Sequence, residues 1–179
     1  MVEVDSPSGP LTICSFHAPP GVNWKERKPQ ALMALAEWLA THSGRTLVGM
    51  DANAPKTDHP DIMQSQWWWK EEALLLGSQA LHHLDDALRL WLAVHPFEAE
   101  RLYALKPQGP LAISYDRGKK HSIPCRYDFI YVTSDFTVAH VDYLYHEAIE
   151  AGSDHALVVA DLYLGNIHTS SANKYNDEG

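Results

Sequence analysis

The chain has 179 residues, of which 45% are hydrophobic and 21% charged, a composition typical of one globular domain. Its formal net charge of −9 disfavours a broad electrostatic attraction to nucleic acid, because an acidic surface repels phosphates. The sequence contains no apolar run near the roughly 20 residues of a membrane span, and it opens without the pattern of a signal peptide. Cys14 and Cys125 are far apart, so we expect two reduced thiols in a cytoplasmic protein.

The first 50 residues predict a hairpin, a helix and a buried strand. Two apolar stretches flank the turn-forming sequence Asp-Ser-Pro-Ser-Gly, which predicts a β-hairpin over residues 2–16. The helix is expected to begin with Asn23 as its N-cap. Its apolar residues recur at helical spacing: Leu32, Leu35, Trp38 and Leu39. Residues 45–50 then predict a short strand that runs directly into Asp51.

The middle of the chain gives weaker signals. The segment 67–70 holds three consecutive tryptophans and a lysine, which suit either packing against a core or an aromatic binding platform. Residues 81–96 predict one helix. His82 and His83 would point about 100° apart on it, which is poor geometry for a shared metal, so we interpret them as surface histidines.

Apolar segments dominate the last third of the chain and predict four strands, at residues 111–115, 126–132, 137–145 and 155–164. About seven strands and two or three helices indicate an α+β layered fold. The polar tail over residues 165–179 is expected to be disordered.

Polar side chains stand where several of these strands begin or end, and strand formation does not require them. They are His17, Asp51, Asn53, Asp128, Asp154 and His155. In extended backbone, the two-residue spacing of Asp51 and Asn53 aims both side chains to the same side. Each site also has a plain structural interpretation: Asp51 and Asn53 suit an Asx turn, and Asp128 could pair with Arg126. Such a set of acids, an amide and imidazoles is also what a phosphate-cleaving metal centre requires.

Four motifs, "HAPPG", "GMDANAP", "RYDFIYV" and "GSDHALV", resemble the closing motifs of the endonuclease/exonuclease/phosphatase family, which has the deoxyribonuclease-I-like fold. The segment "HLDDALRLW" resembles a further family stretch, with Asp86 at the position of its aspartate. The resemblance spans residues 2–164. Met50 departs from the family's usual glycine. The resemblance implies a layered α/β sandwich and a metal-dependent phosphoester hydrolase.

The resemblance also implies a role for each polar residue. Asp51 would orient or deprotonate the attacking water, and Asn53 would steady Asp51 or a phosphate oxygen. His155 would contact the phosphate while Asp128 holds its other ring nitrogen. His17 would assist the leaving group.

Asp154 would be the ligand of Mg²⁺ or Mn²⁺. Arg117 lies in the only dense basic stretch, residues 116–121, and is a candidate to bind substrate beside Asn53 and His155. That stretch also suits a solvated hairpin loop.

The family's opening half, with its early Asn and its metal-binding Glu, has no counterpart in this sequence. We therefore expect residues 1–164 to form the C-terminal part of such a domain, with one sheet lacking its cover. Exposing several hundred Å² of apolar surface to water costs on the order of 10 kcal/mol. We therefore expect a partner to cover this surface: the N-terminal half, a second subunit or a homodimer mate.

Three functions stay open from the sequence. The first is a nuclease-like hydrolase that acts on nucleic acid or a small phosphoester and is present as a fragment. The second is a shortened homologue that binds a phosphate ligand or a partner without catalysis. The third is a phosphatase of small or lipid-linked phosphates. Stacking on Trp68 or its neighbours would suit a nucleobase or a lipid surface.

Overall fold

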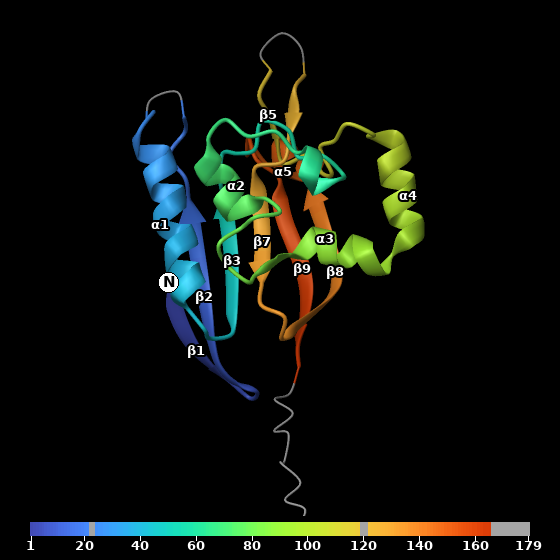
Figure 1. Ribbon diagram of the computed structural model, residues 1–179. Coiled ribbons are helices and arrows are strands. Elements are labelled where there is room, and N and C mark those ends of the chain that lie inside the picture. Colours follow the sequence, from blue (N-terminus) through green and yellow to red (C-terminus); the bar gives the residue numbers. More distant parts are fainter. Residues whose placement is uncertain (22–23, 119–121, 166–179) are drawn as a thin grey trace, which may run out of the picture.

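A five-stranded sheet, ordered β1-β2-β3-β7-β4, forms the centre of the computed structural model, which describes residues 1–21, 24–118 and 122–165 (Figure 1). Strands β1 (Val2–Ser6) and β2 (Gly9–His17) form the predicted hairpin, and β3 (Thr46–Asp51) runs parallel to β2. Strand β7 (Asp128–Val132) is antiparallel to β3, and the two-residue β4 (Asp85–Asp86) forms the far edge. The hairpin and the strand before Asp51 are confirmed.

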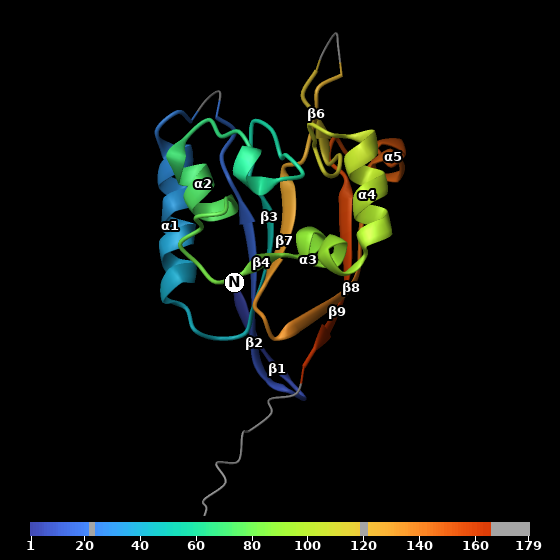
Figure 2. The ribbon, with the colours of Figure 1, turned by 45° about the vertical axis from the view of Figure 1, so that its right-hand side comes forward.

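Helices α1 (Arg27–Thr41) and α2 (Lys70–Leu76) pack against each other and cover one face of this sheet (Figures 1 and 2). The apolar stripe of α1 meets the buried side chains of β3 and β7 in one core, which contains Leu32, Leu35, Leu39, Val48, Met50, Leu75, Phe129 and Tyr131. Asn23, predicted as the N-cap, lies outside the described residues, and that prediction is wrong because α1 begins at Arg27 with Glu26 in the N-cap position. A single 3₁₀ turn, η1 (Ile62–Gln64), precedes α2.

A second layer is built from β8 (Phe136–Leu144) and β9 (Leu157–Leu164), which pair antiparallel and are joined by helix α5 (Tyr145–Glu150). Helices α3 (Ala87–Val94) and α4 (Pro96–Leu105) lie beside it (Figure 2). A second apolar cluster joins α3 to β7 and β8 through Leu88, Leu92, Val132, Val138 and Val141. Within the described residues the protein is thus a mixed α+β fold with three sheets and five α-helices.

The prediction of a single helix over residues 81–96 is wrong at both ends. The carboxylate of Asp86 accepts a hydrogen bond from the Leu88 amide at 3.0 Å and caps α3, so the helix begins only at Ala87. Pro96 cannot continue the hydrogen-bond ladder of α3 and instead opens α4.

His82 is buried, in contrast to the surface position predicted for it. Its Nε2 lies 2.8 Å from the carbonyl oxygen of Leu75, and its ring packs edge-on against Tyr131. His83, by contrast, is exposed as predicted.

The strand predicted at 111–115 is also shorter than expected. Only Tyr115 of that segment pairs, in the small sheet of β5 (Tyr115–Asp116) and β6 (Pro124–Cys125).

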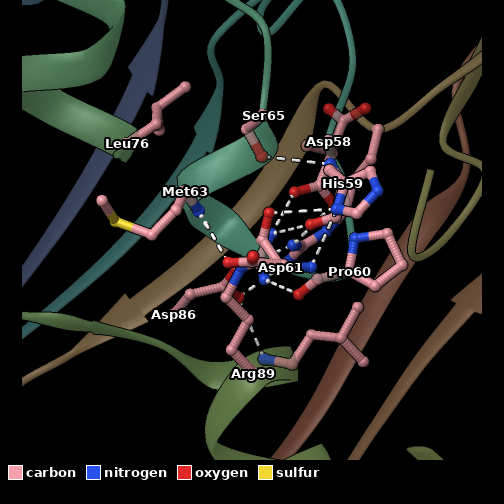
Figure 3. A network of polar contacts seen from close by, with 12 residues as sticks. Asp58, His59, Pro60, Asp61, Met63, Ser65, Leu76, Asp86 and Arg89 are labelled. Carbon is pink, nitrogen blue, oxygen red and sulfur yellow. Dashed lines mark hydrogen bonds and ion pairs between the residues drawn. The ribbon is translucent and has the colours of Figure 1, made fainter. Parts of the chain in front are cut away.

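A buried network of charges around Arg126 links the two layers, because Arg126 binds Asp86 of β4 and also donates to the hydroxyl oxygen of Tyr143 of β8 at 2.8 Å. Arg126 is 1% exposed and makes two hydrogen bonds to the carboxylate of Asp86, at 2.6 and 2.7 Å. It also reaches Asp58 at 3.3 Å. Arg89 binds Asp58 and the carbonyl oxygens of residues 59 and 60 (Figure 3). The alternative pairing of Arg126 with Asp128 is therefore wrong, because burial commits the guanidinium to Asp86 and Asp58.

Apolar side chains remain exposed on the outer face of β9, where Leu157 is 58%, Val159 38% and Tyr163 67% exposed. In the part of the chain that the structure describes, no helix combines the length and hydrophobicity needed to cross a membrane. The tail predicted to be disordered lies, over residues 166–179, outside the described residues.

Candidate active site

Three neighbouring strands bring His17, Asp51 and Asp128 into one row at an edge of the central sheet. His17 is the last residue of β2 and pairs in register with Asp51, the last residue of β3. Asp51 pairs in turn with Asp128, the first residue of the antiparallel β7. Paired residues on adjacent strands project to the same face and lie about 5 Å apart. The imidazole Nε2 of His17 is 3.3 Å from Asp51 Oδ2.

His155 joins this row from the segment that leads into β9. Its Nδ1 lies 2.8 Å from Asp128 Oδ2. The hydrogen bond to Asp128 raises the pKa of His155 above its ordinary value, against the opposing effect of burial, and the negative charges of Asp128 and Asp51 add to the increase. The contact leaves the other ring nitrogen, Nε2, as the one that can face a ligand, so the pair can present a positive charge to an anion.

Asp51 is held by Asn53. The Asn53 backbone amide donates to Asp51 Oδ1 at 2.8 Å, and its side-chain Nδ2 donates to Asp51 Oδ2 at 3.1 Å. Asn53 takes a positive φ of 48°, which asparagine tolerates better than most residues. The Asx-turn interpretation is thus confirmed, and the same contacts also fix the carboxylate in place.

Burial raises the pKa of Asp51, and the nearby charge of Asp128 raises it further, while the Asn53 amide and the two histidines oppose the change. A carboxyl group with a raised pKa is a stronger base than an ordinary aspartate. A cation that lies between two carboxylates on adjacent strands also relieves the repulsion between their negative charges.

Sequence reasoning missed a buried ion pair beneath this site. Lys28 Nζ lies 3.1 Å from Glu72 Oε1, and the two side chains are 1% and 0% exposed. The same ammonium donates to the carbonyl oxygen of Asn53 at 2.5 Å. The sequence did contain a feature that could have predicted the burial of Lys28, because this residue continues the apolar stripe of α1 four residues before Leu32. A lysine that is buried on such a stripe needs a partner for its charge.

A divalent cation could be held by part of this group. One ligand atom each from Asp51, Asp128 and His155 lies within 4.8 Å of the others. Because His155 Nδ1 is already bound to Asp128, the two carboxylates are the better ligands, and hard oxygens are what Mg²⁺ and Mn²⁺ prefer. The donor set therefore fits such an ion. Asp154, the ligand predicted from the sequence, is exposed and does not belong to this group of three.

The three consecutive tryptophans have three environments. Trp67 packs against the main core, while Trp69 lies against Gly21 and under the ammonium of Lys28. Trp68 is 49% exposed, with the Arg117 guanidinium 5.5 Å from its ring centre. The two interpretations apply to different residues: Trp67 is a packing residue, and Trp68 is exposed at the surface with cations over its ring.

In comparisons with known proteins, the sequence matches no family model and no curated protein.

Proposed function

We propose that this chain is a metal-dependent phosphoester hydrolase of the endonuclease/exonuclease/phosphatase type, with the deoxyribonuclease-I-like fold and a nuclease-like activity. The observation that supports the proposal most is the convergence of His17, Asp51, Asp128 and His155. They come from four separate segments of the chain and meet at one sheet edge. No feature of folding requires a second acid opposite Asp51 there.

Each side chain has a task that its surroundings favour. Asp51, whose carboxylate is held in a fixed orientation by Asn53, accepts a proton from the attacking water. The imidazolium of His155, held by Asp128, stabilises the negative charge that develops on the phosphoryl oxygens. His17 is 70% exposed at its side chain, next to Asp51, and can reach the leaving oxygen.

A bound Mg²⁺ or Mn²⁺ would neutralise charge on the phosphoryl oxygens. Asp51 and Asp128 would contribute its ligands from this chain, and Asp154 stays a predicted further ligand. Mg²⁺ sites commonly use one or two carboxylates together with water and substrate phosphate.

The test is turnover of bis(p-nitrophenyl) phosphate and of a short DNA duplex in the presence of Mg²⁺. We expect Asp51→Asn and His155→Ala each to lower kcat at least ~10²-fold with the circular dichroism spectrum unchanged. Asp5→Asn, an identical chemical change at an exposed position of β1, is the matched control and should leave kcat unchanged. Equal turnover in wild type and both site variants would show the roles to be wrongly assigned.

The exposed apolar face of β9 supports the accompanying proposal of a protein partner. Leu157, Val159 and Tyr163 form a strip that a further layer could cover. By resemblance, that layer is the family's opening half, which also contributes a metal-binding Glu. The two alternative partners that could cover this strip are a second, different subunit and a second copy of this chain. Light scattering identifies the second copy, since it gives twice the mass of 20.1 kDa.

A second candidate function is phosphate-ligand binding without catalysis. The observation in its favour is that the cluster offers only three ligand groups among the described residues, which is few for tight cation binding. It predicts that inorganic phosphate binds equally well with and without Mg²⁺. The hydrolase proposal predicts tighter phosphate binding when Mg²⁺ is present.

A further inference from the structure

A pocket of about 360 Å³ adjoins the candidate active site. Its walls include the aromatic and polar side chains of Asn53, Trp68, Trp69, Tyr115, Arg117 and Tyr127. We propose that this pocket binds the nucleobase of the substrate by stacking, so that the phosphoester acted on belongs to a nucleotide. This inference deepens the proposed function and rests on it for the position of the phosphate.

Two residues join the pocket to the active site. Asn53 lines the pocket and also binds both oxygens of Asp51. The ring of Tyr115 lies 4.8 Å from the ring of His155 and 5.6 Å from that of Tyr127. Base and phosphate are separated by one sugar in a nucleotide, so a base site and a phosphate site must be immediate neighbours. The shared wall meets this requirement.

The chemistry of the pocket suits a flat, electron-rich ring linked to an anion. Two cations lie over the ring of Trp68, which is 49% exposed: Lys56 Nζ is 5.3 Å and the Arg117 guanidinium 5.5 Å from the ring centre. Stacking on aromatic and guanidinium planes is the common way to bind an unpaired base. Among the described residues that line the pocket none is acidic, although the chain as a whole carries a net charge of −9. A local excess of positive charge favours an anionic ligand.

The volume sets the size of the ligand. Pockets for small molecules begin near 300 Å³, so about 360 Å³ takes one base with its sugar and not a stretch of duplex. The base can come from a free nucleotide or from the end of a single strand. A membrane surface, the other partner that exposed tryptophans suit, would require a protruding patch and not a recess lined by Tyr115 and Tyr127.

The test is isothermal titration calorimetry of the full chain with adenosine, with AMP, with a single-stranded tri-adenylate and with inorganic phosphate. We expect adenosine to bind, and Trp68→Ala to weaken its binding about 5- to 150-fold, the range that loss of one base-stacking face produces. Trp68→Phe should retain most of the affinity. The affinity for inorganic phosphate should not change in Trp68→Ala. Tighter binding of AMP indicates that the base comes from a free nucleotide, and tighter binding of tri-adenylate indicates the end of a single strand.

Trp24→Ala is the matched control. Trp24 is 41% exposed and has a guanidinium, that of Arg27, 4.9 Å from its ring centre, but it is not part of the pocket. Its loss should leave adenosine binding unchanged. The inference is overturned if adenosine does not bind, or if Trp24→Ala and Trp68→Ala weaken binding equally.

Adenosine separates this inference from the proposed function, because it fills a base site but carries no phosphoester to hydrolyse. Adenosine binding that depends on Trp68 in a chain that hydrolyses no phosphoester would support the base site and refute the hydrolase. Hydrolysis with no effect of Trp68→Ala on adenosine or AMP would refute the base site alone.

Discussion

Replacing Lys28 by methionine would leave Glu72 as a buried carboxylate without its cation. Both side chains are almost fully excluded from water, and Glu72 Oε2 accepts a hydrogen bond from the Trp68 amide at 2.8 Å. Removing one partner of a buried ion pair costs about 3–5 kcal/mol. This is a large share of the 5–15 kcal/mol by which a domain of this size is usually stable.

The loss should depend on pH. Burial raises the pKa of Glu72, and Lys28 opposes this increase, so its removal raises that pKa further. A carboxyl group whose pKa is higher in the folded state holds a proton that the unfolded chain releases. The penalty in Lys28→Met therefore grows as the pH rises from the unfolded value of about 4.3 through the folded value.

Urea denaturation at pH 5 and pH 8 measures this penalty, and a double variant gives the control. Lys28→Met with Glu72→Gln removes both charges but keeps an oxygen for the Trp68 amide, so it should be more stable than Lys28→Met alone. Its turnover should stay below that of wild type, because the carbonyl oxygen of Asn53 loses the Lys28 contact. The reasoning is refuted if Lys28→Met costs under 1 kcal/mol at pH 8, or if the double variant is no more stable than the single one.

Two further changes test the other charged contacts. Asp128→Asn should lower the pKa of His155, because it removes the hydrogen bond and the charge that raise it; NMR titration of the imidazole measures this, and an unchanged value would contradict the assigned pair. The His155–Asp128 contribution to stability should be present below the unfolded pKa of about 6.5 and be lost as the pH rises through the folded value. Arg126→Met should destabilise the fold by about 3–5 kcal/mol, since it leaves Asp86 buried without its main counter-charge; calorimetry showing less than 1 kcal/mol would argue against this.

The elements with strong local signals could be predicted from the sequence. The hairpin has a turn sequence between two apolar runs, and α1 has an apolar stripe at helical spacing. The row at the sheet edge was also foreseeable in part. Polar residues directly after buried strands, such as Asp51, have no role in the strand itself, and strand pairing decides which of them meet.

The buried charges could not be predicted in the same way. Arg126 and Asp86 are 40 residues apart, and charged residues are on the surface in most proteins, so nothing local marks them as partners. The burial of His82 depends on its contact with Leu75 and Tyr131, which only the tertiary fold brings near. Lys28 is the exception, because its place on the stripe of α1 marks it.

Binding of Mn²⁺, followed by electron paramagnetic resonance of the free ion, tests most directly whether this sheet edge is a metal-dependent phosphoester site. The account predicts that wild type binds Mn²⁺ and that Asp51→Asn combined with Asp128→Asn weakens binding at least ~10-fold. Added phosphate should strengthen binding in wild type only. Equal Mn²⁺ affinity in wild type and the double variant, with no effect of phosphate, would contradict it.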